Sequence, residues 1–272
     1  MKLSVIFTTY NSPLWLEKVL WGYQYQEFKN FEVIVADDGS TSETSDVIKR
    51  IQQKIGFNIK HIWQNDRGFR KCEILNKAIV ATESDYLVFS DGDCIPRADF
   101  LKVHFTKRKN GYYLSGGYFK LPIFISEIIT ENDIASGRSF DISWLKKNGL
   151  KASFKNSKLF LNGLPAKLMN AITPTNDSWN GHNSSAWKKD IMAVNGFDER
   201  MRYGSEDREF GERLMNNGAK GKQIRYSAIC LHLDHSRNYV NQTDLDNNAA
   251  IRKETKEKRK VWTDFGIVKK AH

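Results

Sequence analysis

Short apolar runs alternate with amphipathic stretches over the first hundred residues of the chain. The apolar runs predict buried strands over 3–7, 31–36, 59–63 and 86–89. The stretches between them have helical spacing and predict helices over 13–25, 42–54 and 71–82. This alternation is typical of βαβ units, in which helices cover a parallel sheet. We therefore expect an α/β fold with a mixed, mainly parallel sheet flanked by helices.

The pattern is weaker in the rest of the chain. It predicts a helix from Pro96 to about Lys109, a strand over 112–119, and helix with mobile loop over 131–175. A helix over 206–217 and a pair of short strands over 223–233 are expected next. From Asn247 onward the chain is charged and helix-prone, which predicts a solvated basic helix. A surface for acidic lipid head groups is the second interpretation of this tail.

Composition is that of a globular protein with excess positive charge. The 272 residues include 42 lysines and arginines against 32 aspartates and glutamates, and the net charge of +10 favours anionic partners. No apolar run approaches the ~18 residues that span a bilayer. Three scattered cysteines and an N-terminus without a signal-peptide pattern predict reduced thiols in a cytoplasmic protein. Peripheral contact with the inner face of the membrane stays open.

Polar clusters follow three of the predicted strands. They are residues 8–11, 37–40 and 91–93. Because ligands bind outside the carboxyl ends of strands in open α/β sheets, we expect these clusters to converge on one crevice. Their hydroxyls and carboxylates suit a nucleoside and a divalent cation. The glycine-rich signatures of dinucleotide-binding and phosphate-binding loops are absent from the sequence.

Asp91 and Asp93 are the sharpest candidates for chemistry. Two carboxylates one residue apart behind a buried strand can hold Mg²⁺ or Mn²⁺ and leave positions open for phosphate. A D-x-D pair alone is more often a turn, and the cluster 37–40 alone is better interpreted as a turn with a helix cap.

Taken together, the motifs resemble a known family. FTTYN at 7–11, ADDGS at 36–40, NDRGFR at 65–70 and DGD at 91–93 occur in order and at fitting spacing. They resemble the nucleotide-binding half of inverting glycosyltransferases of family 2, which have the GT-A fold. NGFDE at 195–199 and YGSED at 203–207 are similar to the galactosyltransferase-like carboxyl-terminal region of many members. The resemblance covers about residues 1–239.

The resemblance implies a role for each matching position on the donor side. Nucleotide-binding roles fall to Thr8, Tyr10 and Asp38 at the uridine, to Asp66 and Arg70, and to Asp91 at the ribose or donor sugar. Asp93 is the implied metal ligand. A histidine completes the metal shell in many relatives, and here both His232 and His235 are candidates, with His232 favoured by strand alternation. A structural histidine is the equally weighted alternative for this pair.

The resemblance also implies residues for the acceptor side. Glu206 and Asp207 are expected at the acceptor, with Asp207 as the catalytic base. Trp179, Gly181 and Asn183 are candidates for a wall that contacts the donor sugar and the acceptor, although a core tryptophan is a serious alternative. Tyr203 stands where many relatives carry tryptophan, so the sugar specificity is open.

These features predict a metal-dependent, inverting transferase that uses a UDP-sugar and Mn²⁺ or Mg²⁺. It would move a hexose (galactose, glucose or an N-acetyl form) to a hydroxyl of a glycan, glycolipid or glycoprotein. We expect residues 1–110 to form the nucleotide-sugar half, 111–240 the acceptor and catalytic-base half, and 241–272 a basic helical extension. Whether the chain forms a homo-oligomer, and whether it is one module of a longer polypeptide, are both open.

Two other classes of protein compete with this prediction. A sugar nucleotidyltransferase usually has a glycine- and arginine-rich loop after its first strand, and residues 8–11 contain neither residue type. A basic, non-enzymatic nucleic-acid-binding module would interleave its basic residues with exposed aromatics. In this chain the basic residues are spread out and peak in a tail without such interleaving. We therefore expect no specific nucleic-acid partner.

Overall fold

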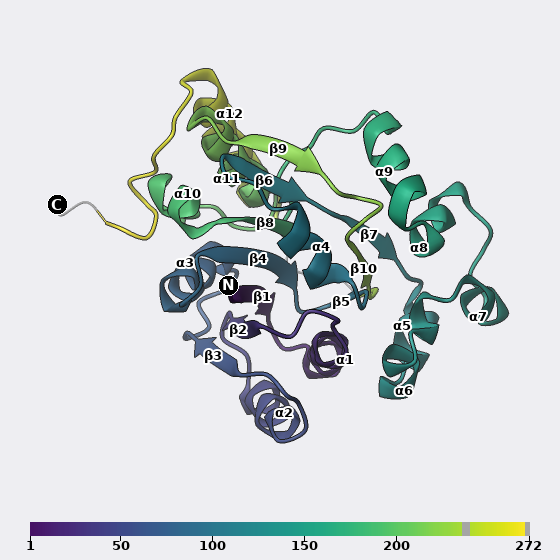
Figure 1. Cartoon of the computed structure of the whole chain (residues 1–272). Coiled ribbons are helices and arrows are strands. Elements are labelled where there is room, and N and C mark those ends of the chain that lie inside the picture. The colour runs from purple at the N-terminus through teal and green to yellow at the C-terminus, as the bar shows by residue number, and fades with distance from the viewer. Residues whose placement is uncertain (236–239, 270–272) are drawn as a thin grey trace.

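The computed structural model describes residues 1–235 and 240–269 of the chain. Four parallel strands form one half of the main sheet, in the order β3-β2-β1-β4 (Figure 1). They are β1 (Leu3–Thr9), β2 (Phe31–Asp37), β3 (Ile59–Trp63) and β4 (Tyr86–Asp91). Each falls on a predicted apolar run, so the parallel half of the sheet is confirmed.

Three more strands complete a seven-stranded sheet in the order β3-β2-β1-β4-β8-β6-β9. They are β6 (Tyr112–Ser115), β8 (Asn183–Trp187) and β9 (Lys220–Gln223). Strand β8 runs antiparallel to both β4 and β6, whereas β9 is parallel to β6. The expected mixed, mainly parallel sheet is therefore confirmed, although β8 itself was not predicted.

A second sheet of three strands lies beside the first one, in the order β5-β10-β7. Its strands are β5 (Cys94–Pro96), β7 (Gly117–Lys120) and β10 (Ile229–His232). The single strand expected over 112–119 is thus wrong, because the chain changes sheets at Gly116. A Cβ atom there would lie 2.0 Å from the side chain of Asn183, so only glycine fits. Pro96 ends β5 and does not open a helix, which starts later as α4 (Phe100–Lys107).

Helices cover both faces of the main sheet and create two cores. One face carries α1 (Pro13–Gln24) and α2 (Ser42–Gln52), and the other carries α3 (Lys71–Ala81), α10 (Lys188–Ala193) and α11 (Glu206–Asn216). Alternation along β1 sends Val5 and Phe7 into the first core and Ile6 into the second. Each fully buried side chain of this size contributes roughly 1.5–3 kcal/mol to folding.

Short helices replace the expected helix and mobile loop of 131–175. They are α5 (Ile123–Ile128), α6 (Glu131–Ala135), α7 (Ile142–Lys147), α8 (Ser157–Phe160) and α9 (Gly163–Ile172). They gather beside the smaller sheet, on the side of the molecule away from β3 (Figure 1). Among the described residues, no helix is both long and apolar enough to cross a membrane.

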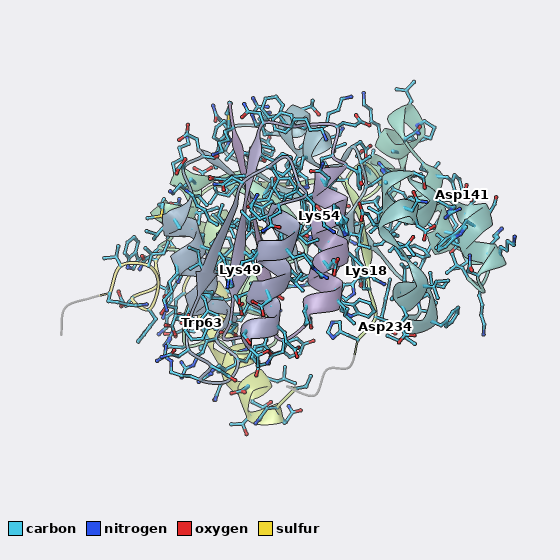
Figure 2. All side chains as sticks on the ribbon, turned by 90° about the horizontal axis from the view of Figure 1, so that it is seen from below. Lys18, Lys49, Lys54, Trp63, Asp141 and Asp234 are labelled. Atoms are coloured by element: carbon cyan, nitrogen blue, oxygen red, sulfur yellow. The ribbon has the colours of Figure 1, made fainter. Side chains whose placement is uncertain are left out.

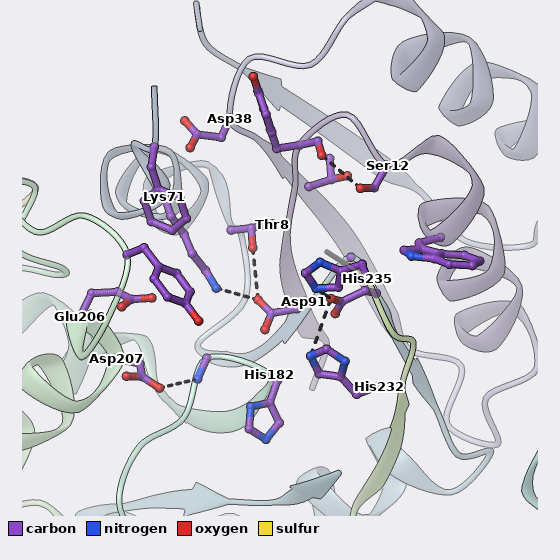
Figure 3. A pocket seen from close by; sticks show the side chains of 18 of the residues that line it. Thr8, Ser12, Asp38, Lys71, Asp91, His182, Glu206, Asp207, His232 and His235 are labelled. Carbon is purple, nitrogen blue, oxygen red and sulfur yellow. Dashed lines mark hydrogen bonds and ion pairs between the residues drawn. The ribbon is translucent and has the colours of Figure 1, made fainter. Parts of the chain in front are cut away.

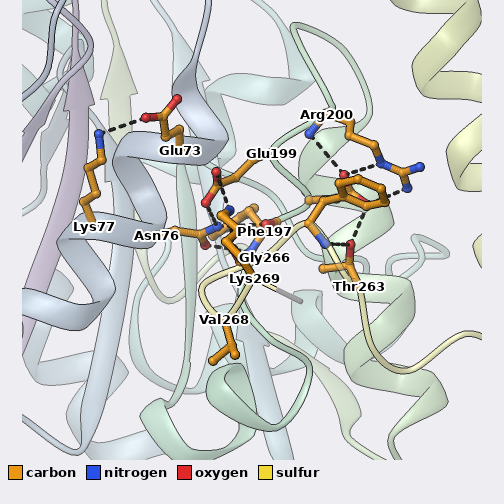
Figure 4. A network of polar contacts seen from close by, with 12 residues as sticks. Glu73, Asn76, Lys77, Phe197, Glu199, Arg200, Thr263, Gly266, Val268 and Lys269 are labelled. Carbon is orange, nitrogen blue, oxygen red and sulfur yellow. Dashed lines mark hydrogen bonds and ion pairs between the residues drawn. The ribbon is translucent and has the colours of Figure 1, made fainter. Parts of the chain in front are cut away.

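The carboxyl-terminal residues return to the body of the protein. Helix α12 (Gln242–Glu257) packs on α11, with Asn248 buried and Arg252 paired to Glu212 at 2.7 Å. Further on, the Asn195 side chain donates hydrogen bonds to the carbonyl groups of Thr263 and Val268. Figure 4 labels Thr263 and Val268 in the network of polar contacts around them. The expectation of a solvated helix therefore holds only for the outer face of α12.

Candidate active site

A cavity of about 790 Å³ opens where the carboxyl ends of β1 and β4 meet the start of α11 (Figure 3). Many of the predicted site residues line it, namely Thr8, Tyr10, Asp38, Asp91, Asp93, Gly181, Tyr203, Glu206, Asp207, His232 and His235. Its volume lies within the range of small-molecule sites, about 300–1,000 Å³. Residues from both halves of the sequence therefore share one cavity.

The end of β2 supplies a carboxylate that is held firmly in place. Asp38 accepts hydrogen bonds from the Gln64 side chain at 2.6 Å and from the backbone N–H of Arg70 at 2.7 Å. Burial nevertheless raises its pKa above the ordinary value for aspartate. The Tyr10 hydroxyl donates to Asp66 at 2.9 Å, and this bond raises the pKa of Tyr10.

Asp66 and Arg70 themselves are not among the cavity-lining residues. Asp66 positions the cavity residue Tyr10 by accepting its hydroxyl hydrogen bond, and the backbone N–H of Arg70 positions the Asp38 carboxylate. Direct contact of either side chain with a nucleotide stays a prediction.

Three side chains that were candidates for a metal site lie together. The Nε2 atom of His235 is 3.0 Å from Oδ2 of Asp93, and the Nε2 atom of His232 is 3.7 Å from the same oxygen. The Nδ1 atom of His232 lies 2.9 Å from the carbonyl oxygen of Leu233. Because a carbonyl only accepts, Nδ1 carries a proton, and Nε2 is the nitrogen that faces Asp93. Both histidines, treated as alternatives above, face the same carboxylate.

This donor set fits a divalent cation. One carboxylate and two imidazoles are ligands that Mn²⁺ accepts, whereas an all-oxygen set would favour Mg²⁺. The Cys94 thiol is also close to Asp93 and His232. Burial raises its pKa well above the ordinary value, so it stays protonated and donates to Asp93 at 3.3 Å. Through this hydrogen bond the Cys94 thiol supports the Asp93 carboxylate.

Lys71 is a cavity residue that the sequence analysis missed. Its Nζ atom lies 2.7 Å from Oδ1 of Asp91, which also accepts from the Thr8 hydroxyl at 3.2 Å. Burial acts to raise the pKa of Asp91, but the Lys71 charge outweighs it and lowers that pKa to about 2. Lys71 is also attracted by the charges of Glu206 and Asp207. The available signal was its position directly after the motif at 65–70, in the first turn of a predicted helix.

The two candidate catalytic carboxylates begin α11. Glu206 accepts from the backbone N–H of Gly204 at 2.9 Å, and Asp207 accepts from that of Gly181 at 3.3 Å. Gly204 has a φ of +105°, so the turn before the helix requires glycine. Burial raises the pKa of Glu206 to about 7 and also raises that of Asp207. Each carboxylate is thus a better proton acceptor than one in water.

His182 is a second missed residue of the cavity. Its ring lies 4.5 Å from that of Tyr118, which is also in the lining. Burial lowers the pKa of His182 to about 4, so the imidazole is neutral near pH 7. It lies between Gly181 and Asn183, two of the candidates for the predicted wall, and a polar ring at that position was the available signal.

For two residues, the predicted place in the cavity wall is wrong. Trp179 is fully buried, and its ring packs against Phe89 and Phe210 in the second core, so it has no face for a sugar. Asn183 is fully buried as well, and its amide donates to the carbonyl groups of Gly117 and Ala228. Both residues support the loop that carries Gly181, which does line the cavity.

Asn248 of α12 holds the loop that precedes the candidate catalytic carboxylates. Its side-chain amide donates to the carbonyl groups of Arg202, Tyr203 and Gly204 at 3.0, 3.1 and 2.7 Å. Its Oδ1 atom accepts from the Arg202 N–H at 3.2 Å. The sequence analysis did not identify this residue, because an asparagine in a charged helix carries no pattern of its own.

We expect Asn248→Ala to lower both stability and turnover. The substitution removes these partners from the part-buried backbone groups of the 202–204 loop, which costs about 1–3 kcal/mol. Urea unfolding and kcat measure the two effects. The neighbouring Asn247 is exposed, so Asn247→Ala is the matched control and should change stability by less than about 0.5 kcal/mol. Equal stability of the two variants would contradict the assignment.

Comparison with protein families identifies the class that this fold and cavity define. Residues 4–118 match the model of glycosyl transferase family 2, and residues 174–236 match the model described as the N-terminal domain of galactosyltransferase. The two ranges coincide with the two groups of motifs in the sequence. The chain therefore contains a glycosyltransferase family 2 region over residues 4–118, followed by a galactosyltransferase-like region over residues 174–236.

Known proteins agree with this assignment. Chondroitin synthase of Escherichia coli is 27% identical over 253 residues, which cover 85% of this chain but only 34% of that protein. The mannosyltransferase PcManGT of Pyrobaculum calidifontis, solved with GDP-Man and Mn²⁺, aligns with a TM-score of 0.57 and 17% identity, over 87% of this chain and 58% of its own. TarS 1–349 of Staphylococcus aureus, solved with UDP-GlcNAc, aligns with a TM-score of 0.58 and 18% identity, over 88% and 60%. These likenesses show that the fold is GT-A.

Proposed function

We propose that the chain is a metal-dependent, inverting glycosyltransferase. It moves a hexose, in the form of galactose, glucose or an N-acetyl derivative, from a UDP-sugar to a hydroxyl of a glycan, glycolipid or glycoprotein. The observation that carries the proposal is the grouping of three chemistries around one cavity. These are the strand-end hydroxyls and carboxylates, the cluster of Asp93 with His232 and His235, and the carboxylates that begin α11.

The three groups suit the parts of a nucleotide sugar. Thr8, Tyr10 and Asp38 provide hydroxyls and a carboxylate for the uridine. Asp93, His232 and His235 would hold the divalent cation, which when bound neutralises charge on the diphosphate. The relatives solved with GDP-Man and Mn²⁺ and with UDP-GlcNAc support a nucleotide-sugar donor of this kind.

In the proposed reaction Asp207 accepts the proton of the acceptor hydroxyl. That oxygen forms a bond to the anomeric carbon, while the bond from this carbon to the diphosphate oxygen breaks and UDP leaves with the electron pair. One displacement inverts the configuration at the anomeric carbon. A hydrolase would instead place two carboxylates on either side of the scissile bond. Water would then attack the sugar directly, or would hydrolyse a covalent glycosyl-enzyme intermediate. Here Asp93 lies in the histidine cluster, so the carboxylates that begin α11 are left for the base.

Calorimetric titration of UDP into the whole chain, with and without Mn²⁺, tests the donor site. We expect binding that strengthens by at least about tenfold with Mn²⁺, because the cation links the diphosphate to Asp93 and the histidines. GDP and ADP are the matched ligands, and both should bind more weakly than UDP. Absence of nucleotide binding in any metal would sink the proposal. Tighter GDP binding would replace the uridine assignment.

A further inference from the structure

Helix α9 presents an apolar stripe to solvent. Leu164, Leu168 and Ile172 are 76%, 61% and 60% exposed, although they are spaced for one face of a helix. Ala166 on α9 is buried, and the Asn170 side chain donates to the Ser227 hydroxyl at 2.9 Å. Since each residue turns the helix by about 100°, the stripe is displaced two residues, or about 200°, from the anchored face. The apolar side of α9 is therefore the outer one.

The neighbouring helix segments extend this apolar surface. Phe154 and Phe160, just before and at the end of α8, are 76% and 59% exposed. Single exposed apolar residues are ordinary in proteins, but several on adjoining short helices indicate a binding surface. We call the segment 142–176, which contains all of these residues, the apolar–basic segment.

The charge of this segment indicates what it binds. It contains six lysines and neither aspartate nor glutamate, in a chain that has 32 acidic residues elsewhere. The lysines are Lys146, Lys147, Lys151, Lys155, Lys158 and Lys167. In the part of the chain that the structure describes, these six side chains form no ion pair with a carboxylate. A surface that combines exposed leucine and phenylalanine with unpaired lysine is complementary to an anionic bilayer.

The basic tail was the other candidate for lipid contact, but several of its basic side chains form ion pairs with carboxylates. Arg252 pairs with Glu212, and both Lys258 and Lys260 pair with Glu254, at distances of 2.7–2.9 Å. Three of its basic side chains are therefore held in ion pairs within the protein. A second copy of the chain is also a poor partner for the apolar–basic segment, because two such surfaces would bring their lysines together.

We propose that the apolar–basic segment docks the protein on an anionic lipid surface. Leu164, Leu168 and Ile172 enter the boundary between head groups and acyl chains. The lipid phosphates are contacted by the five exposed lysines, which are Lys146, Lys147, Lys151, Lys155 and Lys167. The segment adjoins the cavity, because Lys158 donates to the carbonyl group of Tyr118, a cavity residue, at 3.4 Å. This proposal is independent of the proposed transfer reaction, since it concerns only where the protein binds.

Co-sedimentation of the whole chain with vesicles tests the docking. We expect at least tenfold tighter binding to a three-to-one mixture of phosphatidylcholine and phosphatidylglycerol than to phosphatidylcholine alone, with weaker binding in ~0.5 M salt. The double variant Leu164→Gln/Leu168→Gln should bind the anionic vesicles roughly tenfold more weakly. Lys151→Glu/Lys155→Glu should show a similar loss.

Matched controls place the same changes elsewhere on the surface. Val80→Gln/Met215→Gln removes exposed apolar side chains from α3 and α11. Lys49→Glu/Lys54→Glu reverses two charges at the end of α2, which is separated in Figure 2 from the segment that follows Asp141. Both controls should bind vesicles like the unchanged protein. Each altered position is exposed, so the fold should survive, and circular dichroism checks this.

Three outcomes would overturn the proposal. The first is absence of binding to anionic vesicles, and the second is equal binding to both vesicle types. The third is a loss in the matched controls as large as that in the α9 and lysine variants. If the protein ignores vesicles but self-associates in sedimentation velocity, and Leu164→Gln/Leu168→Gln abolishes this, the surface is an interface between copies instead.

Discussion

Asp207→Asn should lower kcat by about 10²–10⁴-fold while leaving UDP binding intact. The amide is nearly isosteric with the carboxylate, and its oxygen can still accept the Gly181 N–H bond, so the loop geometry is retained. What is lost is the ability to take a proton from the acceptor. Turnover with a competent donor and acceptor, measured beside UDP titration, separates the two effects.

The neighbouring carboxylate provides the matched control. Glu206→Gln removes the same charge one residue away and keeps an acceptor for the Gly204 N–H. If Asp207 is the base, this variant should retain much more turnover than Asp207→Asn. The reverse order would transfer the role to Glu206, and near-normal turnover in both would exclude a base at this position.

The pH profile follows from the same pair of carboxylates. Burial raises the pKa of Glu206 to about 7 and raises that of Asp207. A base acts only when deprotonated, so the burial of Asp207 moves the acid limb of the profile to higher pH. As the pH falls, kcat should therefore begin to drop at a higher pH than it would with an exposed aspartate as the base. A profile of kcat against pH measures this limb.

Helix and strand positions were predictable wherever burial on one face leaves a periodic pattern. The strands β1 to β4 and the helices between them have such patterns, and the structure confirms them within a few residues. Strand β8 has none, since Ser184 and Ser185 are small and polar yet fully buried. Hydrogen bonds with the Tyr86 hydroxyl and with Nδ1 of His104 satisfy the Ser185 hydroxyl. Polar partners from distant segments, which no local pattern reveals, make this strand possible.

In the candidate site, too, local sequence patterns could be predicted, whereas contacts between distant segments could not. Strand ends are a property of the chain's own sequence, so Asp38, Asp91 and Asp93 could be predicted at one edge of the sheet. Trp179 could not be assigned, because whether a tryptophan faces a cavity or a core depends on packing partners such as Phe210. The role of Asn248 depends on how α12 returns to the 202–204 loop, which is a fact of tertiary structure.

Asp93→Ala should abolish the dependence of the protein on Mn²⁺. The substitution removes the oxygen that both His232 and His235 face, so the cation loses its only carboxylate in this cluster of described residues. Losing Lewis-acid stabilisation of a leaving diphosphate costs several kcal/mol, or about 10²–10³-fold in kcat. The UDP affinity of the variant should be the same with and without Mn²⁺ in calorimetric titration.

Chelation supplies an independent check of the same site. Wild-type protein in EDTA should fall to the activity of Asp93→Ala, and added Mn²⁺ should rescue the wild type alone. Asp46→Ala removes the same charge from an exposed position on α2, where the aspartate contacts only Lys49 at 3.7 Å, and it should behave like the wild type. His232→Ala and His235→Ala should each weaken Mn²⁺ binding, because both rings face Asp93. Full Mn²⁺ stimulation in Asp93→Ala would mean that the cation binds elsewhere. The histidine cluster would then have a structural role.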